Sequence, residues 1–83
     1  MAYDKFRYEI VKSLGVISER TDNTGSKWIR EVNLVSWNGR DPKLDIREWN
    51  ADHSRMSKGL TFTESEAESL YMTLHNYLAE RNE

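Results

Sequence analysis

The sequence predicts an α+β protein, in which a curved four-stranded antiparallel sheet is followed by one C-terminal helix (β-β-β-β-α). Two observations predict it. Up to Phe62, β-branched and aromatic residues recur in four runs that polar loops separate, which is typical of strands. After Thr63, apolar residues change to the spacing of a helix. With no internal repeat and 83 residues, we expect a single domain, 1–83.

The first strand is expected over residues 5–18, where apolar residues fall mostly at even positions and predict one buried face. Gly15 interrupts this run and indicates a bulge or a bend. The later strands are expected at 28–37, 43–49 and 58–62, with polar loops at 20–27 and 50–57. The apolar residues of the first strand are Phe6, Tyr8, Ile10, Leu14 and Val16.

The helix is expected over residues 64–81. Thr63 and Glu66 have the spacing of a capping box, in which each side chain binds the backbone of the other residue. The apolar stripe exceeds what one small sheet can bury, and so short a chain has a thin core, so we expect a homodimer. The stripe contains Leu70, Tyr71, Leu74, Tyr77 and Leu78.

Composition excludes several classes of protein. The chain has no cysteine, so thiolate metal sites and thiol nucleophiles are excluded. No His, Asp or Glu cluster has metal-ligand spacing, and no nucleophile has an orienting base, so we expect no metal, no cofactor and no enzyme. No apolar run reaches the roughly 18 residues of a membrane span, so we expect a cytoplasmic protein without membrane contact.

The charge distribution leaves a nucleic-acid partner open. The net charge is −2, but residues 1–63 have a balance of +2 and residues 64–83 a balance of −4. The positive end of the helix dipole favours acidic side chains in the first turn, which explains much of the negative charge of this segment without a partner. A basic surface on the sheet therefore remains compatible with the composition.

The segment from Trp37 to Trp49 predicts a hairpin. Asn38-Gly39 alone suggests a two-residue turn, but that register would mix apolar and charged side chains on one face. A five-residue loop over 38–42, with Trp37 opposite Lys43, separates the two kinds of side chain. Pro42, which cannot donate to a strand ladder, favours this second register.

The two faces of this hairpin predict different roles. We expect the helix to cover the apolar face, which holds Val32, Leu34, Leu44 and Ile46. The other face would present Trp37 and Trp49 beside Lys43 and Arg47. Aromatic rings that stack on bases, beside cations that contact phosphates, are the requirements for binding single-stranded nucleic acid. Val35 and Asp45 lie on the same face and dilute its positive charge.

The segments "SWNGRDPKLDIREW" and "MSKGLTFTESEAESL" resemble the transcriptional coactivator family called positive cofactor four, and most closely its compact, YdbC-like bacterial branch. The resemblance is specific over residues 36–64. It implies a dimer of β-β-β-β-α subunits that binds single-stranded DNA on its sheets. Residues 55–57 stand where eukaryotic members have a longer and more basic loop.

The resemblance and the face pattern together define the expected binding residues. The aromatic and basic turn of the family falls on Trp37, Asn38, Gly39 and Arg40, its strand arginine on Arg47, its strand-end aromatic on Trp49, and its basic residue before the fourth strand on Lys58. The face pattern adds Lys43. Further phosphate contacts at Lys12, Lys27 and Arg30 stay open, as does the contribution of the 50–57 loop.

Two hypotheses of function follow. The first is a DNA-associated, coactivator-like protein of transcription or DNA maintenance that binds single-stranded DNA with little sequence preference, with RNA binding left open. The second is a protein-interaction module, because tryptophan and arginine also form hot spots between proteins. Base preference and cellular process are not determined by the sequence.

Overall fold

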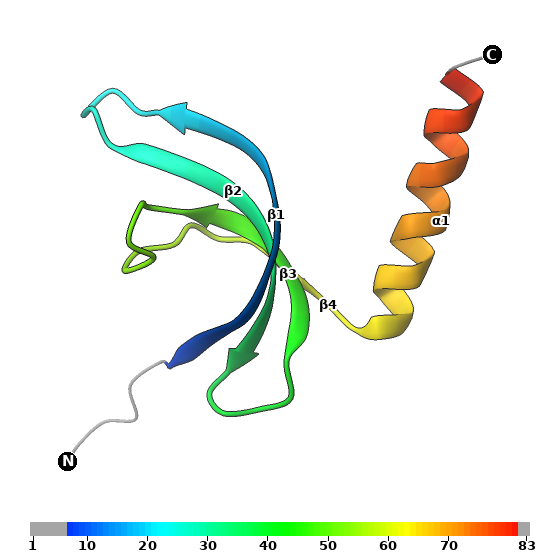
Figure 1. Ribbon diagram of the computed structural model, residues 1–83, viewed down its shortest axis with the longest axis horizontal. Helices are drawn as coiled ribbons and strands as arrows, with labels where there is room; N and C mark the ends of the chain where they lie inside the picture. Colours follow the sequence, from blue (N-terminus) through cyan, green and yellow to red (C-terminus); the bar gives the residue numbers. More distant parts are fainter. Residues whose placement is uncertain (1–6, 82–83) are drawn as a thin grey trace.

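The computed structural model describes residues 7–81, which form a four-stranded antiparallel sheet and one helix (Figure 1). The strands lie in the order β1-β2-β3-β4, so every strand pairs with its neighbour in sequence. The predicted number, type and order of elements is confirmed. Phe6 lies outside the described residues. The elements are β1 (Tyr8–Thr21), β2 (Lys27–Trp37), β3 (Lys43–Trp49), β4 (Leu60–Phe62) and α1 (Glu64–Arg81).

The sheet is strongly curved, because its longest strand is irregular. The pairing of β1 with β2 shifts register three times, between Ile10 and Lys12, between Ser13 and Gly15, and between Val16 and Ser18. Bulges of this kind bend a strand and increase its twist. The irregularity at Gly15 was predicted, but the expectation of one continuous buried face is wrong, since Leu14 and Val16 are exposed.

The β2–β3 hairpin combines features of both expected registers. Asn38 and Gly39 have φ angles of 54° and 77°, and the Arg40 amide donates to the Trp37 carbonyl at 3.0 Å, so a tight turn forms. The strands then pair Val35 with Lys43 and Leu34 with Leu44. The prediction that Trp37 pairs with Lys43 is therefore wrong by two residues.

The predicted division of apolar and charged side chains between the two faces is correct despite the wrong register. A shift of two residues returns each side chain to the same side of a strand, whereas a shift of one would invert it. Cross-strand partners share a face, and Val32, Leu34, Leu44 and Ile46 lie on one face as expected, although the pairs are Val32 with Ile46 and Leu34 with Leu44. We call this side the convex face; Glu31, Asn33, Asp45 and Arg47 pair on the opposite side, the concave face.

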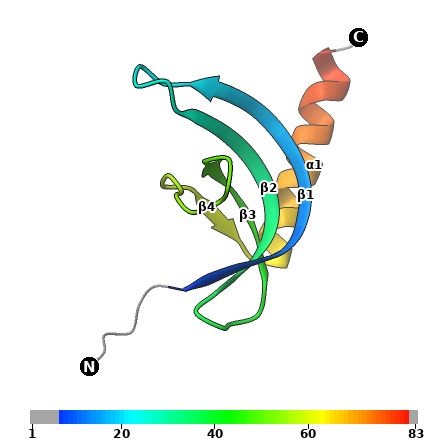
Figure 2. The same cartoon turned by 60° about the vertical axis from the view of Figure 1, so that its left-hand side comes forward.

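The buried core lies on the concave face. Val35 and Trp49 are its fully buried apolar residues, with Asn33 and Asp45 beside them. The loop of residues 50–57 curls into the concavity of the sheet and covers this core (Figure 2). His53 fastens the loop, because its Nε2 lies 2.9 Å from Oε1 of Glu31 and its carbonyl accepts a hydrogen bond from the Tyr8 hydroxyl.

Helix α1 projects away from the sheet. Among the described elements it packs only against β3 and β4, and Figure 1 shows the rest of it standing clear of the strands. The expectation that α1 covers the convex face is therefore wrong within one chain, where that face is only half-buried. The apolar stripe of α1 is also accessible to solvent, and its exposed members are Tyr71, Leu74, Tyr77 and Leu78.

The start of α1 forms the predicted capping box. The Glu66 amide donates to Oγ1 of Thr63 at 3.1 Å, and the Thr63 amide donates to Oε1 of Glu66 at 2.9 Å. Within residues 7–81, no helix is long and apolar enough to cross a membrane.

Candidate nucleic-acid interface

Arg47 and Trp37 form a stacked pair on the concave face. The guanidinium carbon of Arg47 lies 4.6 Å from the centre of the Trp37 ring, within the range of a cation–π contact. Arg47 Nε and Nη2 donate to the two carboxylate oxygens of Asp45 at 2.7 and 2.8 Å. The structure thus brings together Trp37 and Arg47, as expected, but it also neutralises the Arg47 charge with a fully buried carboxylate.

The surroundings of Arg47 hold it rigidly. Its Nη1 donates to the Ser57 carbonyl at 3.3 Å, and its side chain is only 12% exposed. Gly59 permits this packing, because a Cβ there would stand 2.3 Å from Cβ of Arg47 and 2.5 Å from the Ile46 carbonyl oxygen. Arg47 is therefore a fixed support beneath the Trp37 ring, with little surface of its own to offer a phosphate.

The exposed part of the interface is the turn between β2 and β3. Asn38, Gly39, Arg40 and Lys43 are exposed, and the Trp37 ring is half-buried. Arg40 and Lys43 therefore keep their cations in solvent beside an aromatic ring, which is the combination that single-stranded nucleic acid requires. Four of the eight expected residues are thus exposed on this turn, next to Trp37, which is partly accessible.

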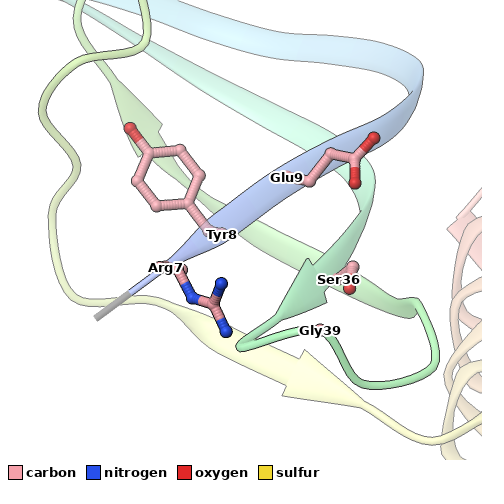
Figure 3. A pocket seen from close by; sticks show the side chains of 5 residues that line it. All are labelled: Arg7, Tyr8, Glu9, Ser36 and Gly39. Atoms are coloured by element: carbon pink, nitrogen blue, oxygen red, sulfur yellow. The ribbon is translucent and has the colours of Figure 1, made fainter. Parts of the chain in front are cut away.

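Arg7 joins this turn and was missed by sequence reasoning. Its amide donates to Oδ1 of Asn38 at 2.9 Å, and the Asn38 amide donates back to the Arg7 carbonyl at 2.8 Å. Figure 3 shows the Arg7 guanidinium directed toward the turn at Gly39, in a surface pocket of about 220 Å³. A basic residue 31 positions from Asn38 carries no local signal, so only the pairing of the first and second strands reveals it.

Trp49 is not an exposed aromatic ring in this structure. It is 0% exposed, with ring centres of Tyr8 and His53 at 5.2 and 5.4 Å. The expectation that Trp49 stacks on bases is therefore wrong for this conformation, since the ring belongs to the core. The first strand, which is distant in sequence, and the 50–57 loop, which folds back directly after Trp49, close over the predicted open face.

Lys58 is exposed but lies apart from the turn. It lines a second surface pocket, of about 280 Å³, together with Arg30, Glu48 and Leu60. Arg30 pairs with Glu48 and Leu60 with Ile46, so this pocket opens on the convex face. The predicted residues therefore divide between two surfaces, and they do not form one continuous patch within a single chain.

Paired charges surround this second pocket. The hydrogen bond from Arg20 lowers the pKa of the Glu48 carboxyl and raises the pKa of Arg20 itself. No group of three His, Cys, Asp or Glu side chains within residues 7–81 is arranged to hold a metal ion.

The structure is a small β-β-β-β-α domain whose β2–β3 hairpin carries aromatic and basic side chains. Residues 25–72 match the family described as "Transcriptional Coactivator p15 (PC4)". The chain is also 42% identical over 67 residues to an uncharacterized protein of Treponema pallidum (strain Nichols), a match that covers 81% of this chain and 74% of that protein. The chain belongs to the PC4 family, which is known for single-stranded DNA binding and transcriptional coactivation and is not enzymatic.

Proposed function

We propose that this protein binds single-stranded DNA with little sequence preference, as a homodimer, and acts in transcription or DNA maintenance in the cytoplasm. The observation that carries the proposal is the half-buried Trp37 ring, supported by Arg47 and flanked by the exposed cations of Arg40 and Lys43. A flat ring stacks on any unpaired base, and cations beside it contact the backbone phosphates. The family match covers this segment and supports the proposal.

Preference for single strands follows from the shape of the site. Bases can stack on Trp37 only when they are unpaired, and the exposed residues sit on a turn rather than on a helix that could enter a major groove. RNA single strands offer the same bases and phosphates, so we include them in the test.

The test is a titration of the protein with fluorescently labelled oligonucleotides of one mixed sequence, as single-stranded DNA, duplex DNA and single-stranded RNA. We expect single-stranded DNA to bind more tightly than the duplex, with affinity that falls as salt rises. Replacing both exposed cations (Arg40→Gln with Lys43→Gln) should reduce the salt slope by about 1.4, or about 0.7 for each phosphate contact. Arg81→Gln, at the far end of α1, is the matched control.

The result also separates the second hypothesis. A protein-interaction surface on this turn predicts no binding of oligonucleotides, or binding that Arg40 and Lys43 do not influence. Equal or tighter binding of the duplex at the same salt would contradict the proposed preference for single strands.

The homodimer is proposed because two apolar surfaces of the single chain are open. The convex face of the sheet is half-buried and the stripe of α1 is exposed, although both are built from side chains typical of a core. A two-fold dimer is the commonest arrangement that covers such surfaces. It would also join two binding turns in one particle, so that one strand of DNA could engage both.

A further inference from the structure

Glu48 lies between two arginines on the convex face and binds one of them more closely than the other. Arg20 Nε and Nη2 donate to Oε2 and Oε1 of Glu48 at 2.8 and 2.9 Å, which occupies both oxygens in a bidentate pair. Arg30 Nη2 stands 3.6 Å from Oε2, beyond hydrogen-bonding distance. The Glu48 side chain is 9% exposed, so its charge faces these two partners and little water.

In this arrangement Arg30 keeps positive charge that the Glu48 carboxylate does not balance. One carboxylate balances one guanidinium, and the shorter contacts assign it to Arg20, whose cation also lies 6.0 Å from the centre of the Trp28 ring. The lowered pKa of Glu48, caused first by the Arg20 hydrogen bond, agrees with this division. Arg30 is 50% exposed, so its remaining donors face the solvent.

Lys58 supplies a second cation to this site. Lys58 is exposed and lines the same pocket of about 280 Å³, where Gly59 contributes backbone without a side chain. Arg47 also borders the pocket, but Asp45 already balances its charge. The side chains at this small pocket and their ion-pair partners thus carry two positive charges in excess, a setting that favours a multiply charged oxyanion.

We propose that the Arg30–Lys58 pocket binds a phosphate group, and that Arg20 is a positioning residue that keeps Glu48 from capturing Arg30. The proposal rests on the proposed function when the phosphate belongs to a DNA backbone. The backbone would then contact the Arg30–Glu48 end of the convex face, beside the apolar residues that the proposed dimer covers, in addition to the turn. A free phosphate compound is the other source of the same chemistry.

The variants separate this model from simple loss of an ion pair. Arg30→Gln should weaken binding of a single-stranded oligonucleotide about tenfold, the loss of one charge-assisted contact, and should reduce the salt slope by about 0.7. Arg20→Gln should weaken it similarly, because Glu48 then captures Arg30. Glu48→Gln breaks the same pair as Arg20→Gln, yet it should raise affinity, because it removes the negative charge that competes with phosphate for Arg30.

The double variant Arg20→Gln/Glu48→Gln is decisive for the positioning role. If Arg20 acts through Glu48, the double variant should recover the affinity that Arg20→Gln loses, because Arg30 is again free. If Arg20 touched phosphate itself, no recovery would occur and the positioning role would be overturned. If the pair were only structural, Arg20→Gln would lose affinity only in proportion to its loss of folded protein, and this result would also overturn the positioning role. Circular dichroism and a melting curve show whether each variant stays folded. Lys58→Gln, at an exposed loop position, is a second variant that tests the pocket.

Inorganic pyrophosphate tests the pocket without DNA. In a ¹⁵N NMR titration of the full chain, we expect shifts of the Arg30 Nε–H and of the Gly59 amide that Arg30→Gln abolishes. If these shifts appear but the wild type does not bind oligonucleotides, the pocket stands, its phosphate comes from a free compound, and the proposed function fails. If oligonucleotides bind normally to Arg30→Gln and pyrophosphate shifts neither group, the pocket is overturned and the proposed function stands.

Discussion

The guanidinium of Arg47 is held between the ring of Trp37, 4.6 Å away, and the carboxylate of Asp45, 2.7 Å from its Nε. The contact therefore joins the candidate interface to the buried core. Asp45 also accepts a hydrogen bond from Oγ1 of Thr61 at 2.8 Å, which ties β4 to the same carboxylate. Substitutions at Arg47 should for this reason change stability as well as binding.

Arg47→Ala should lower the free energy of unfolding by about 3–5 kcal/mol, because it leaves the fully buried Asp45 carboxylate without its charged partner. Urea denaturation followed by circular dichroism measures the change. Lys43→Ala, an exposed cation four residues away, should change stability by no more than about 0.5 kcal/mol. Equal stabilities of the two variants would show that the Asp45–Arg47 pair is not important for folding.

Gly59→Ala should destabilise the protein by about 1–3 kcal/mol, because the new Cβ would collide with Cβ of Arg47 and with the Ile46 carbonyl. Neither obstacle is the far end of a flexible side chain, so the β3–β4 packing must shift. Gly15→Ala is the matched control, since a Cβ there meets nothing within 4 Å, and thermal unfolding compares the two. A Gly59→Ala variant as stable as Gly15→Ala would argue against this packing.

The β1–β2 turn should depend on pH through Asp22. Its Oδ1 accepts hydrogen bonds from the amides of Thr24 and Ser26 and from the Thr24 hydroxyl, and its Oδ2 accepts one from Nε1 of Trp28 at 2.9 Å. These bonds, that of the Thr24 hydroxyl first, lower the pKa of Asp22 far below its ordinary value of 3.8. A lowered pKa contributes stability that is complete above the unfolded value and is lost as pH falls through the folded one.

We therefore expect the Trp28 indole N–H signal, followed by NMR, to stay constant from neutral pH down to about pH 4 and to change only in stronger acid. Asp22→Asn should remove this acid transition and shift the indole signal already at neutral pH. A transition of the wild type centred near 3.8 would mean that the hydrogen bonds do not hold the carboxylate.

Leu74→Glu with Leu78→Glu should separate the proposed homodimer, because it places two charges on the exposed apolar stripe of α1. Light scattering of the wild type should give twice the mass of one 9.8 kDa chain, and the variant should give the mass of one chain or unfold. Asn76→Glu is the control, as an exposed polar position that lies outside the stripe. A wild type that is monomeric at tens of micromolar would contradict the model.

The local signals of the sequence were sufficient for the elements and for the division of the sheet into two faces. Alternation predicted the strands, helical spacing predicted α1, and Thr63 with Glu66 marked its start to the residue. Each of these features is decided within a few positions of the chain. The family motif in residues 36–64 belongs with them, because its residues are neighbours in sequence, and the family match confirmed it.

Only the tertiary structure decided what each face does. Trp49 became core because Tyr8 reaches it from the distant first strand and the adjacent loop folds back to place His53 on it. Arg47 lost its free charge because Asp45 is buried with it. The pairing of Arg20 with Glu48 spans 28 residues, so no local pattern could separate Arg30 as the cation with charge to spare. Burial and ion pairing depend on which distant segments meet, and that meeting is determined by the curvature and register of the whole sheet.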